Sequence, residues 1–279
     1  MILNRTNTKS YLSEKEIADS IRYASYIQAA LLPDAENFKR LLPESFILNL
    51  PRDIVSGDFY WISRIQHRTA VVAADCTGHG VPGAFMSIMG INFLNQIASY
   101  CIPAANKMLN QLREYVMKAL HQKGMEGEQK DGIDMSLCVI DTEARIIEYS
   151  GANSPLFYFK DHELKEIKGD RMPIGVSALI EESFKKHIIP FNEIDSFYIF
   201  SDGYPDQFGG EKYKKLKMKG FRNVIRGVHD KKIGRQAEML IDYLEQWKGD
   251  NHQIDDILIL GINLQPFKKK INGSSKLNL

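Results

Sequence analysis

The 279-residue sequence contains few cysteines and lacks a long apolar run. Its three cysteines, Cys76, Cys101 and Cys138, show no C-x-x-C spacing. This scarcity argues against a zinc ribbon or a disulfide scaffold and is expected in a reducing compartment. No apolar run approaches the roughly 20 residues that a membrane-spanning helix needs, and no signal peptide opens the chain. We therefore expect a cytoplasmic protein without a membrane span.

Charge of neither sign dominates the chain. The 36 lysines and arginines nearly balance the 35 aspartates and glutamates, which leaves a formal net charge of +1. With no basic patch interleaved with aromatic residues, we expect no nucleic-acid partner. The phosphate-binding pattern G-x-x-x-x-G-K-[ST] is also missing. Cys76 is not a tyrosine-phosphatase nucleophile, because that chemistry needs Cys-x5-Arg and the residue six positions on is Pro82.

The first predicted element is a helix near the N-terminus. Ser13 followed three residues later by Glu16 forms a capping-box pattern, which predicts a helix start, and Pro33 ends the helix. Apolar or amphipathic residues then recur at spacings of four, three, four and three: Ile17, Ile21, Ala24, Gln28 and Leu31. Such a stripe either docks on the chain's own domain or seeds a short coiled coil, and with it a homodimer through residues 13–32. We assign residues 1–33 to a linker or regulatory helix.

The rest of the chain clusters strands with strands and helices with helices. Short turns separate the strand-like runs, which favours antiparallel pairing over crossover connections. Strands are predicted at 45–50, 58–64, 69–75, 133–141, 145–150, 155–160, 163–168, 184–190, 197–200 and 257–262, and helices at 82–100, 103–121, 220–229 and 232–247. The pattern predicts an α+β fold with antiparallel sheets and helices packed outside them. We place the main domain at 34–265 and a polar tail at 266–279.

Aspartates stand at four separate strand ends. Asp75 closes an apolar strand before a Gly-His-Gly turn, and Pro82 suits the first position of the helix that follows. Asp58, Asp202 and the pair Asp255–Asp256 occupy similar places. Converging carboxylates need a counter-charge, and a divalent cation supplies it. Oxygen-only sites prefer Mg²⁺ or Mn²⁺, and two such ions sharing a carboxylate activate water for displacement at phosphorus without a protein nucleophile.

Six stretches in order carry a family resemblance: residues 52–60, 75–84, 151–155, 172–176, 201–203 and 255–257. They resemble the motifs of the PPM-type (type 2C) metal-dependent serine/threonine phosphatases, most closely those of the bacterial SpoIIE-like branch. The helix that ends in residues 26–33 resembles the linker before many such domains. The resemblance implies an α-β-β-α sandwich, with two antiparallel sheets flanked by helices and an N-terminal linker helix. It also implies hydrolysis of phosphoserine or phosphothreonine on a bacterial regulatory protein, such as a STAS-type anti-sigma-factor antagonist.

The same resemblance implies a role for each acidic residue around two Mn²⁺ or Mg²⁺ ions. Asp75 would bridge the two ions, and the carbonyl of Cys76 would face the second. Asp202 and Asp255 would bind the first ion, and Asp58 would bind directly or through water. Asp256 is assigned a supporting role, because the family's ligand is the first residue of that pair.

Other residues keep two interpretations at this point. His79 either donates a proton to the leaving oxygen or shapes its turn, and Arg52 either holds the phosphate or pairs with Asp53. Asn153 stands where relatives often have histidine, and we assign it no catalytic role. The chain as a whole is either an active phosphatase or a catalytically silent module that binds a phosphoprotein or dimerises. A silent relative is expected to lack at least one acidic ligand, whereas this chain retains all four: Asp58, Asp75, Asp202 and Asp255.

Overall fold

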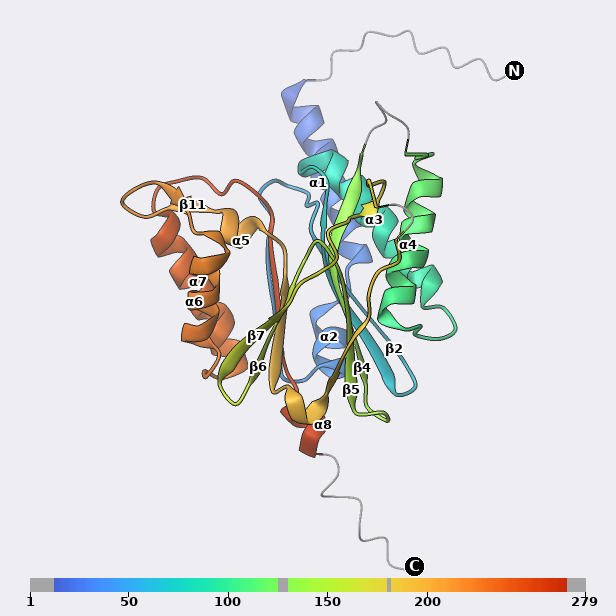
Figure 1. Cartoon of the computed structure of the whole chain (residues 1–279). Helices are drawn as coiled ribbons and strands as arrows, with labels where there is room; N and C mark the ends of the chain where they lie inside the picture. Colours follow the sequence, from blue (N-terminus) through green and yellow to red (C-terminus); the bar gives the residue numbers. More distant parts are fainter. Residues whose placement is uncertain (1–12, 125–129, 180–181, 270–279) are drawn as a thin grey trace, which may run out of the picture.

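The computed structural model describes residues 13–124, 130–179 and 182–269, and it confirms the predicted fold class. Two antiparallel sheets stand face to face and helices cover their outer faces (Figure 1). One sheet has the order β1-β13-β10-β6-β7, and the other has the order β2-β3-β4-β5-β9 with β8 beside β4. No helix among these residues is both long enough and apolar enough to cross a bilayer.

The elements follow one another along the chain with short connections. The first half comprises α1 (Glu14–Leu31), α2 (Ala35–Leu41), β1 (Ser45–Leu50), β2 (Phe59–Ile65), β3 (Arg68–Cys76), α3 (Gly80–Ile97), α4 (Ala105–Ala119) and β4 (Gly132–Asp141). The second half comprises β5 (Ile146–Ala152), β6 (Leu156–Lys160), β7 (Glu163–Ile167), β8 (Ile174–Gly175), β9 (His187–Pro190), a 3-10 turn (Phe191–Glu193), β10 (Ser196–Phe200), α5 (Gly203–Asp206), β11 (Phe208–Gly209), β12 (Lys214–Lys215), α6 (Lys217–Val228), α7 (Ile233–Lys248), β13 (Ile257–Asn263) and α8 (Gln265–Lys269).

Side-chain alternation along the strands builds three apolar layers. In β3, Val71 and Ala73 face the opposite sheet, whereas Ala70, Val72 and Ala74 face α3 and α4. Successive strand residues point to opposite faces, so a strand buried on both sides is apolar throughout. The side chains of β13 alternate in the same way. Leu258 and Leu260 face the opposite sheet, whereas Ile257 and Ile259 face α6 and α7. The result is the predicted α-β-β-α sandwich.

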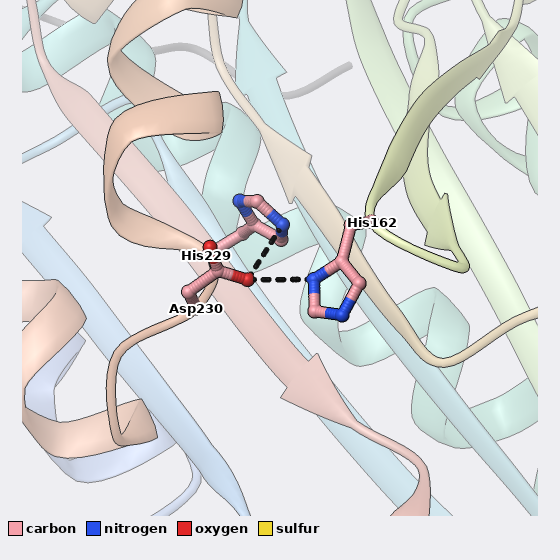
Figure 2. Close-up of side chains that lie close together, drawn as sticks. All are labelled: His162, His229 and Asp230. Carbon is pink, nitrogen blue, oxygen red and sulfur yellow. Dashed lines mark hydrogen bonds and ion pairs between the residues drawn. The ribbon is translucent and has the colours of Figure 1, made fainter.

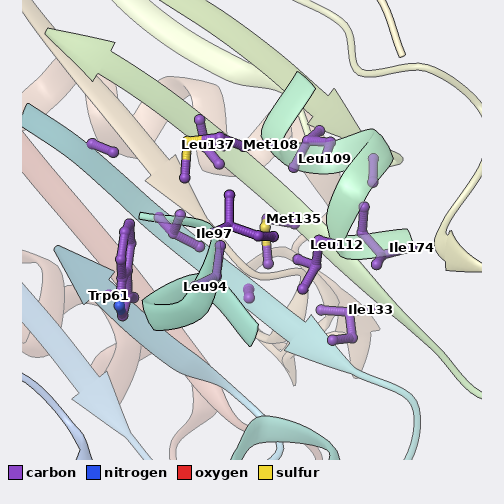
Figure 3. Packing of buried hydrophobic residues seen from close by; sticks show 14 of the residues in the cluster. Trp61, Leu94, Ile97, Met108, Leu109, Leu112, Ile133, Met135, Leu137 and Ile174 are labelled. Atoms are coloured by element: carbon purple, nitrogen blue, oxygen red, sulfur yellow. The ribbon is translucent and has the colours of Figure 1, made fainter. Parts of the chain in front are cut away.

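The helix pair α3 and α4 covers the sheet that contains β4. Leu94 of α3 and Leu109 and Leu112 of α4 gather over Ile133 and Met135 of β4 (Figure 3). All five side chains are almost completely buried. At roughly 2 kcal/mol for each fully buried aliphatic side chain, this layer holds the strand ends firmly enough to support a polar site.

The structure corrects the start of α3 and adds several short elements. The helix begins at Gly80, so Pro82 is its third residue; it is tolerated there because first-turn N–H groups have no partner within the helix. The helix α2 was not predicted, although Asp34 caps it by accepting a hydrogen bond from the Asn37 N–H at 2.7 Å. At the start of the predicted tail, α8 is anchored by Lys268, whose Nζ lies 2.6 Å from Asp195 Oδ1.

The helix α1 has the predicted capping box and docks on its own domain. Ser13 and Glu16 exchange the two capping hydrogen bonds. The amide of Gln28 is buried against α3 and the segment before β2. It donates to the Ser56 carbonyl at 2.6 Å and to Ser87 Oγ at 2.8 Å, and it accepts from the Ser56 N–H at 3.0 Å. The docking interpretation therefore holds for this face of the helix.

Candidate active site

Strand register brings the four predicted aspartates to one end of the sandwich. In one sheet Phe59 pairs with Ala74, so Asp58 stands beside Asp75. In the other sheet Phe200 pairs with Ile259, and Asp202 and Asp255 lie just beyond these strands at the same end. This is the end at which α3 and α5 begin, in the upper part of Figure 1.

Three glycines allow the backbone segments of the site to touch. A Cβ atom on Gly57 would lie 2.7 Å from the Gly78 carbonyl oxygen, and one on Gly83 would lie 2.3 Å from the same atom. A Cβ atom on Gly203 would lie 1.9 Å from the Asp256 carbonyl oxygen. No side chain fits at these distances, so glycine is required where the loops carrying the aspartates approach each other.

Asp58 is the most buried of the four carboxylates. Its side chain belongs to the core, and its Oδ2 atom makes no hydrogen bond within the described structure. Burial raises the pKa of Asp58 well above its usual range, a hydrogen bond from Ser201 opposes the shift, and repulsion from Asp256, Asp255 and Asp202 adds to it. A buried acceptor without a partner indicates that a cation belongs beside it.

The pKa values of the other three carboxylates are raised as well. Burial, followed by repulsion from Asp58, Asp202, Asp255 and Asp134, raises the pKa of Asp75 to about 10. The pKa values of Asp202 and Asp255 are also raised, in each case first by burial. Repulsion from Asp255 contributes to the shifts of the other three residues, so the four residues form one electrostatic cluster.

The cluster fits a divalent metal site. Lys215, whose pKa Asp202 and Asp255 help to raise, hydrogen-bonds to Asp206 rather than to any of the four carboxylates. Arg52 and His79 lower the pKa of Asp255, but the net shift of that pKa is still upward. A set of carboxylate oxygens suits Mg²⁺ or Mn²⁺ in preference to zinc.

Asp256 faces the backbone of the preceding loop. Its Oδ1 accepts the Arg52 N–H at 2.7 Å, and its Oδ2 accepts the Gly57 N–H at 2.8 Å. Both oxygens are thus used to tie the loop before β2 to the start of β13. This geometry is that of a supporting residue.

Arg52, Asp53 and His79 form a chain of contacts beside the cluster. Arg52 Nη2 lies 3.4 Å from Asp53 Oδ2, and its Nη1 donates to the Ile254 carbonyl at 2.9 Å. The Nδ1 atom of His79 lies 3.1 Å from the same Asp53 oxygen. Asp53 therefore orients both residues, and His79 remains half-exposed.

Cys76 contributes no sulfur to the site. Its side chain is buried among apolar residues, and burial, followed by repulsion from Asp75 and Asp58, raises the pKa of its thiol well above the usual range. The thiolate is therefore disfavoured, and only the main-chain carbonyl is available as a ligand.

The sequence analysis missed a fifth acidic residue, Asp134. It stands opposite Asp75 in the register of β3 and β4. Burial raises its pKa, and a hydrogen bond from Asn153 Nδ2 at 2.8 Å opposes the shift. Only the strand register links it to the site, because its sequence context is an ordinary strand start. Asn153, with φ 55°, likewise lies at the site.

A cavity of about 350 Å³ opens beside the cluster. Asp75, Asp134 and Asp202 line it. Lys168, Arg171 and the ion pair of Arg222 with Glu166 line it as well. The cavity therefore offers cations to a substrate at the edge of an acidic site.

Comparison with known proteins decides the family. Residues 65–265 match the model of the family described as stage II sporulation protein E (SpoIIE). The chain belongs to the SpoIIE family. It is a serine/threonine phosphatase domain of the PP2C type, in a metal-dependent family. No curated protein sequence matches it significantly.

Solved structures support the assignment. The SiaA PP2C domain of Pseudomonas aeruginosa is 30% identical, with a TM-score of 0.80 over 90% of this chain and 98% of that one. The PP2C domain of Bacillus subtilis SpoIIE with a fragment of its regulatory domain is 16% identical. Its TM-score is 0.62, and the match covers 79% of this chain and 62% of that one. The structure of the RsbU and RsbW domains of Rv1364c from Mycobacterium tuberculosis is 19% identical. Its TM-score is 0.60, and the match covers 80% of this chain and 60% of that one.

The raised pKa of Asp75 leads to a prediction about stability. Because its folded-state pKa of about 10 exceeds the ordinary 3.8, Asp75 should reduce the stability of the metal-free protein as pH rises from 3.8 towards about 10. At neutral pH, which lies below this pKa, folding requires Asp75 to take up a proton, so Asp75→Asn should raise the Tm of the metal-free protein, by roughly 2–4 °C for each kcal/mol of this cost. Differential scanning fluorimetry in EDTA measures this change.

The exposed Asp242→Asn on α7 is the matched control and should leave Tm unchanged. Added Mn²⁺ should stabilise the wild type more than Asp75→Asn. A lower Tm for Asp75→Asn in EDTA would show that the carboxylate is stabilising and would contradict the electrostatic account.

Proposed function

We propose that the domain hydrolyses phosphoserine or phosphothreonine on a regulatory protein, using two Mn²⁺ or Mg²⁺ ions. The observation that carries the proposal is the cluster of Asp58, Asp75, Asp202 and Asp255, whose pKa values are all raised and which has no neutralising cation of its own. A hydrolase of this kind needs no protein nucleophile.

Each acidic residue has a place in this proposal. Asp75 lies between Asp58 of its own sheet and Asp202 of the other, so it is the residue suited to bridge two ions. Asp202 and Asp255 would hold one ion, and the Cys76 carbonyl would face the other. When bound, such ions activate a water and stabilise charge developing at phosphorus. The chain's own contribution is to fix the positions of these oxygens.

His79 is the proposed proton donor to the leaving oxygen. Asp53 holds its Nδ1 atom at 3.1 Å, which fixes the ring and leaves Nε2 directed elsewhere. The half-exposed position allows contact with a bound phosphoprotein. The contacts of Arg52 with Asp53 and the Ile254 carbonyl favour a structural role for this side chain over phosphate binding.

Two cations of the cavity lining support a phosphorylated protein substrate. Lys168 and Arg171 would attract a phosphate to the edge of the cluster, whereas Arg222 is paired with Glu166. A small regulator of the STAS type remains the proposed substrate class. The relative whose structure contains both RsbU and RsbW domains is consistent with a partner of this kind.

The alternative is a silent module that binds a phosphoprotein without turnover. It would need neither the full acidic set nor the unpartnered Oδ2 of Asp58, both of which this chain has.

The three free cysteines support a cytoplasmic location, which we include in the proposal. The proposal also keeps the division of the chain into residues 1–33, 34–265 and 266–279.

Hydrolysis of an aryl phosphate tests the catalytic proposal. Turnover should require Mn²⁺ or Mg²⁺ and should stop in EDTA. Asp202→Asn should lower kcat/KM by at least about 100-fold, which corresponds to roughly 3 kcal/mol of lost transition-state stabilisation. Asp242→Asn is the control for removal of one carboxylate. A folded wild type that binds Mn²⁺ yet hydrolyses neither aryl phosphate nor phosphorylated regulators would favour the silent module.

The docking of α1 supports a regulatory role for residues 1–33. Gln28 satisfies both main-chain groups of Ser56, which lies two residues before Asp58. A movement of α1 would break these bonds and release the loop that positions Asp58. The helix would then bias the site between formed and unformed states, as a population shift.

Gln28→Ala should weaken metal binding without removing any ligand. Buried main-chain groups left unpaired cost about 1–3 kcal/mol, so the Mn²⁺ concentration for half-maximal activity should rise roughly 10-fold. Deleting residues 1–32 should also change specific activity or metal requirement. Ser25→Ala, which removes only a bond within the helix, is the control. Unchanged activity and metal requirement in both variants would leave α1 a passive linker.

The outer face of α1 supports the proposed homodimer. Tyr23, Ile27 and Leu31 are exposed on it, at 69%, 49% and 43%. Sedimentation equilibrium should show a dimer that Ile27→Glu weakens at least 10-fold, whereas the exposed Lys15→Glu should not. A wild type that stays monomeric at all accessible concentrations would overturn the dimer.

A further inference from the structure

Two histidines and an aspartate meet at the end of the sandwich opposite the aspartate cluster. His162 lies in the turn between β6 and β7, and His229 and Asp230 follow α6 (Figure 2). Because Phe159 pairs with Ser196, at the start of β10, this turn is far from Asp202, which follows the end of β10. Among the described residues, these three alone bring a group of ligand atoms within 4.8 Å of one another.

One carboxylate oxygen lies between the two rings. Asp230 Oδ1 is 2.8 Å from His162 Nδ1 and 2.9 Å from His229 Nε2. The Nε2 atom of His229 is buried, and its contact with Asp230 lacks hydrogen-bond geometry. A buried ring nitrogen beside a carboxylate oxygen, without a hydrogen bond between them, leaves a place for a cation.

The contacts of His229 fix which nitrogen carries the proton. Its Nδ1 lies 2.8 Å from the Arg226 carbonyl, which only accepts, so Nδ1 must carry a hydrogen. In the neutral ring, Nε2 then has a free lone pair. A histidine whose Nδ1–H is held by a main-chain carbonyl and whose Nε2 is free has the arrangement of a metal ligand.

The surrounding structure holds this ring rigidly. The Phe159 ring stacks on His229 with centroids 3.9 Å apart and an angle of 2°. The buried Gln236 side chain donates to the carbonyls of His229 and Lys231, which fixes the turn after α6. Preorganised ligands of this kind are what a metal site requires.

His162 occupies a position that favours glycine. The two turn residues Asp161 and His162 have φ values of 50° and 65°, as in a type I′ hairpin, whose second position strongly prefers glycine. The histidine therefore sits there at a conformational cost. Its side chain is exposed, as is that of Asp230, so both are free to adjust around an ion.

We propose that His162, His229 and Asp230 form a second metal site, for a borderline divalent transition ion such as Zn²⁺. Two imidazole nitrogens and one carboxylate are ligands typical of Zn²⁺, with water as the fourth, whereas Mg²⁺ prefers oxygen alone. The ion would clip the β6–β7 hairpin to the turn after α6. The same two elements carry Glu166 and Arg222, paired at 2.7 Å in the wall of the active-site cavity.

Spectroscopic titration tests the site on the full chain. With Mg²⁺ in excess to saturate the acidic cluster, Co²⁺ should give the visible absorption of a nitrogen-ligated ion at one equivalent, and Zn²⁺ should displace it. Asp75→Asn should retain this signal, which separates the site from the acidic cluster. His121→Gln, a distant exposed histidine, is the control and should also retain it.

His162→Gly separates ligand loss from misfolding. Glycine suits the left-handed turn, so the metal-free variant should be at least as stable as the wild type, while its affinity for Zn²⁺ should fall at least 10-fold. Zn²⁺ should raise the Tm of the wild type and leave that of His162→Gly and Asp230→Asn nearly unchanged. Equal Zn²⁺ affinity in the wild type and His162→Gly, or no Co²⁺ signal in excess Mg²⁺, would overturn the proposal.

Discussion

The cost of gathering four carboxylates at one end of the sandwich is the constraint on which this structure depends. Asp58, Asp75, Asp202 and Asp255 come from both sheets and are brought together at one end, where burial raises the pKa of each. Such a cluster disfavours the folded state until a cation is bound. The apolar layers on both faces of both sheets supply the stability that permits it.

The backbone, more than the side chains, sets the geometry of the cluster. Gly57, Gly83 and Gly203 lie where any Cβ atom would collide with a neighbouring loop. Asp256 then ties the loop before β2 to β13 through two main-chain hydrogen bonds. The ligand positions are thus properties of strand register and close loop contact, which side-chain motion alone does not alter.

The main strands and the aspartates at their ends could be predicted from the sequence, because local patterns determine them. Apolar alternation predicted the main strands, and aspartates next to glycines marked their ends. Asp134 and the bonding of Gln28 to Ser56 depended on contacts between distant segments: no local pattern revealed Asp134, and the stripe that contains Gln28 left docking and a coiled coil both open. His162 and His229 are similarly separated in the chain and meet only because the β6–β7 turn and the end of α6 share one end of the sandwich.

The cost of the cluster bears on whether the domain is an enzyme. A protein that only binds a phosphoprotein would gain stability by replacing any one of the four carboxylates with a neutral residue, since that change relieves repulsion and desolvation together. Asp58 is the clearest case, because one of its oxygens is buried without a hydrogen bond. The proposed metal site would account for retaining all four, since bound cations would offset this cost. The stability lost at the strand ends is therefore a physical argument for that site.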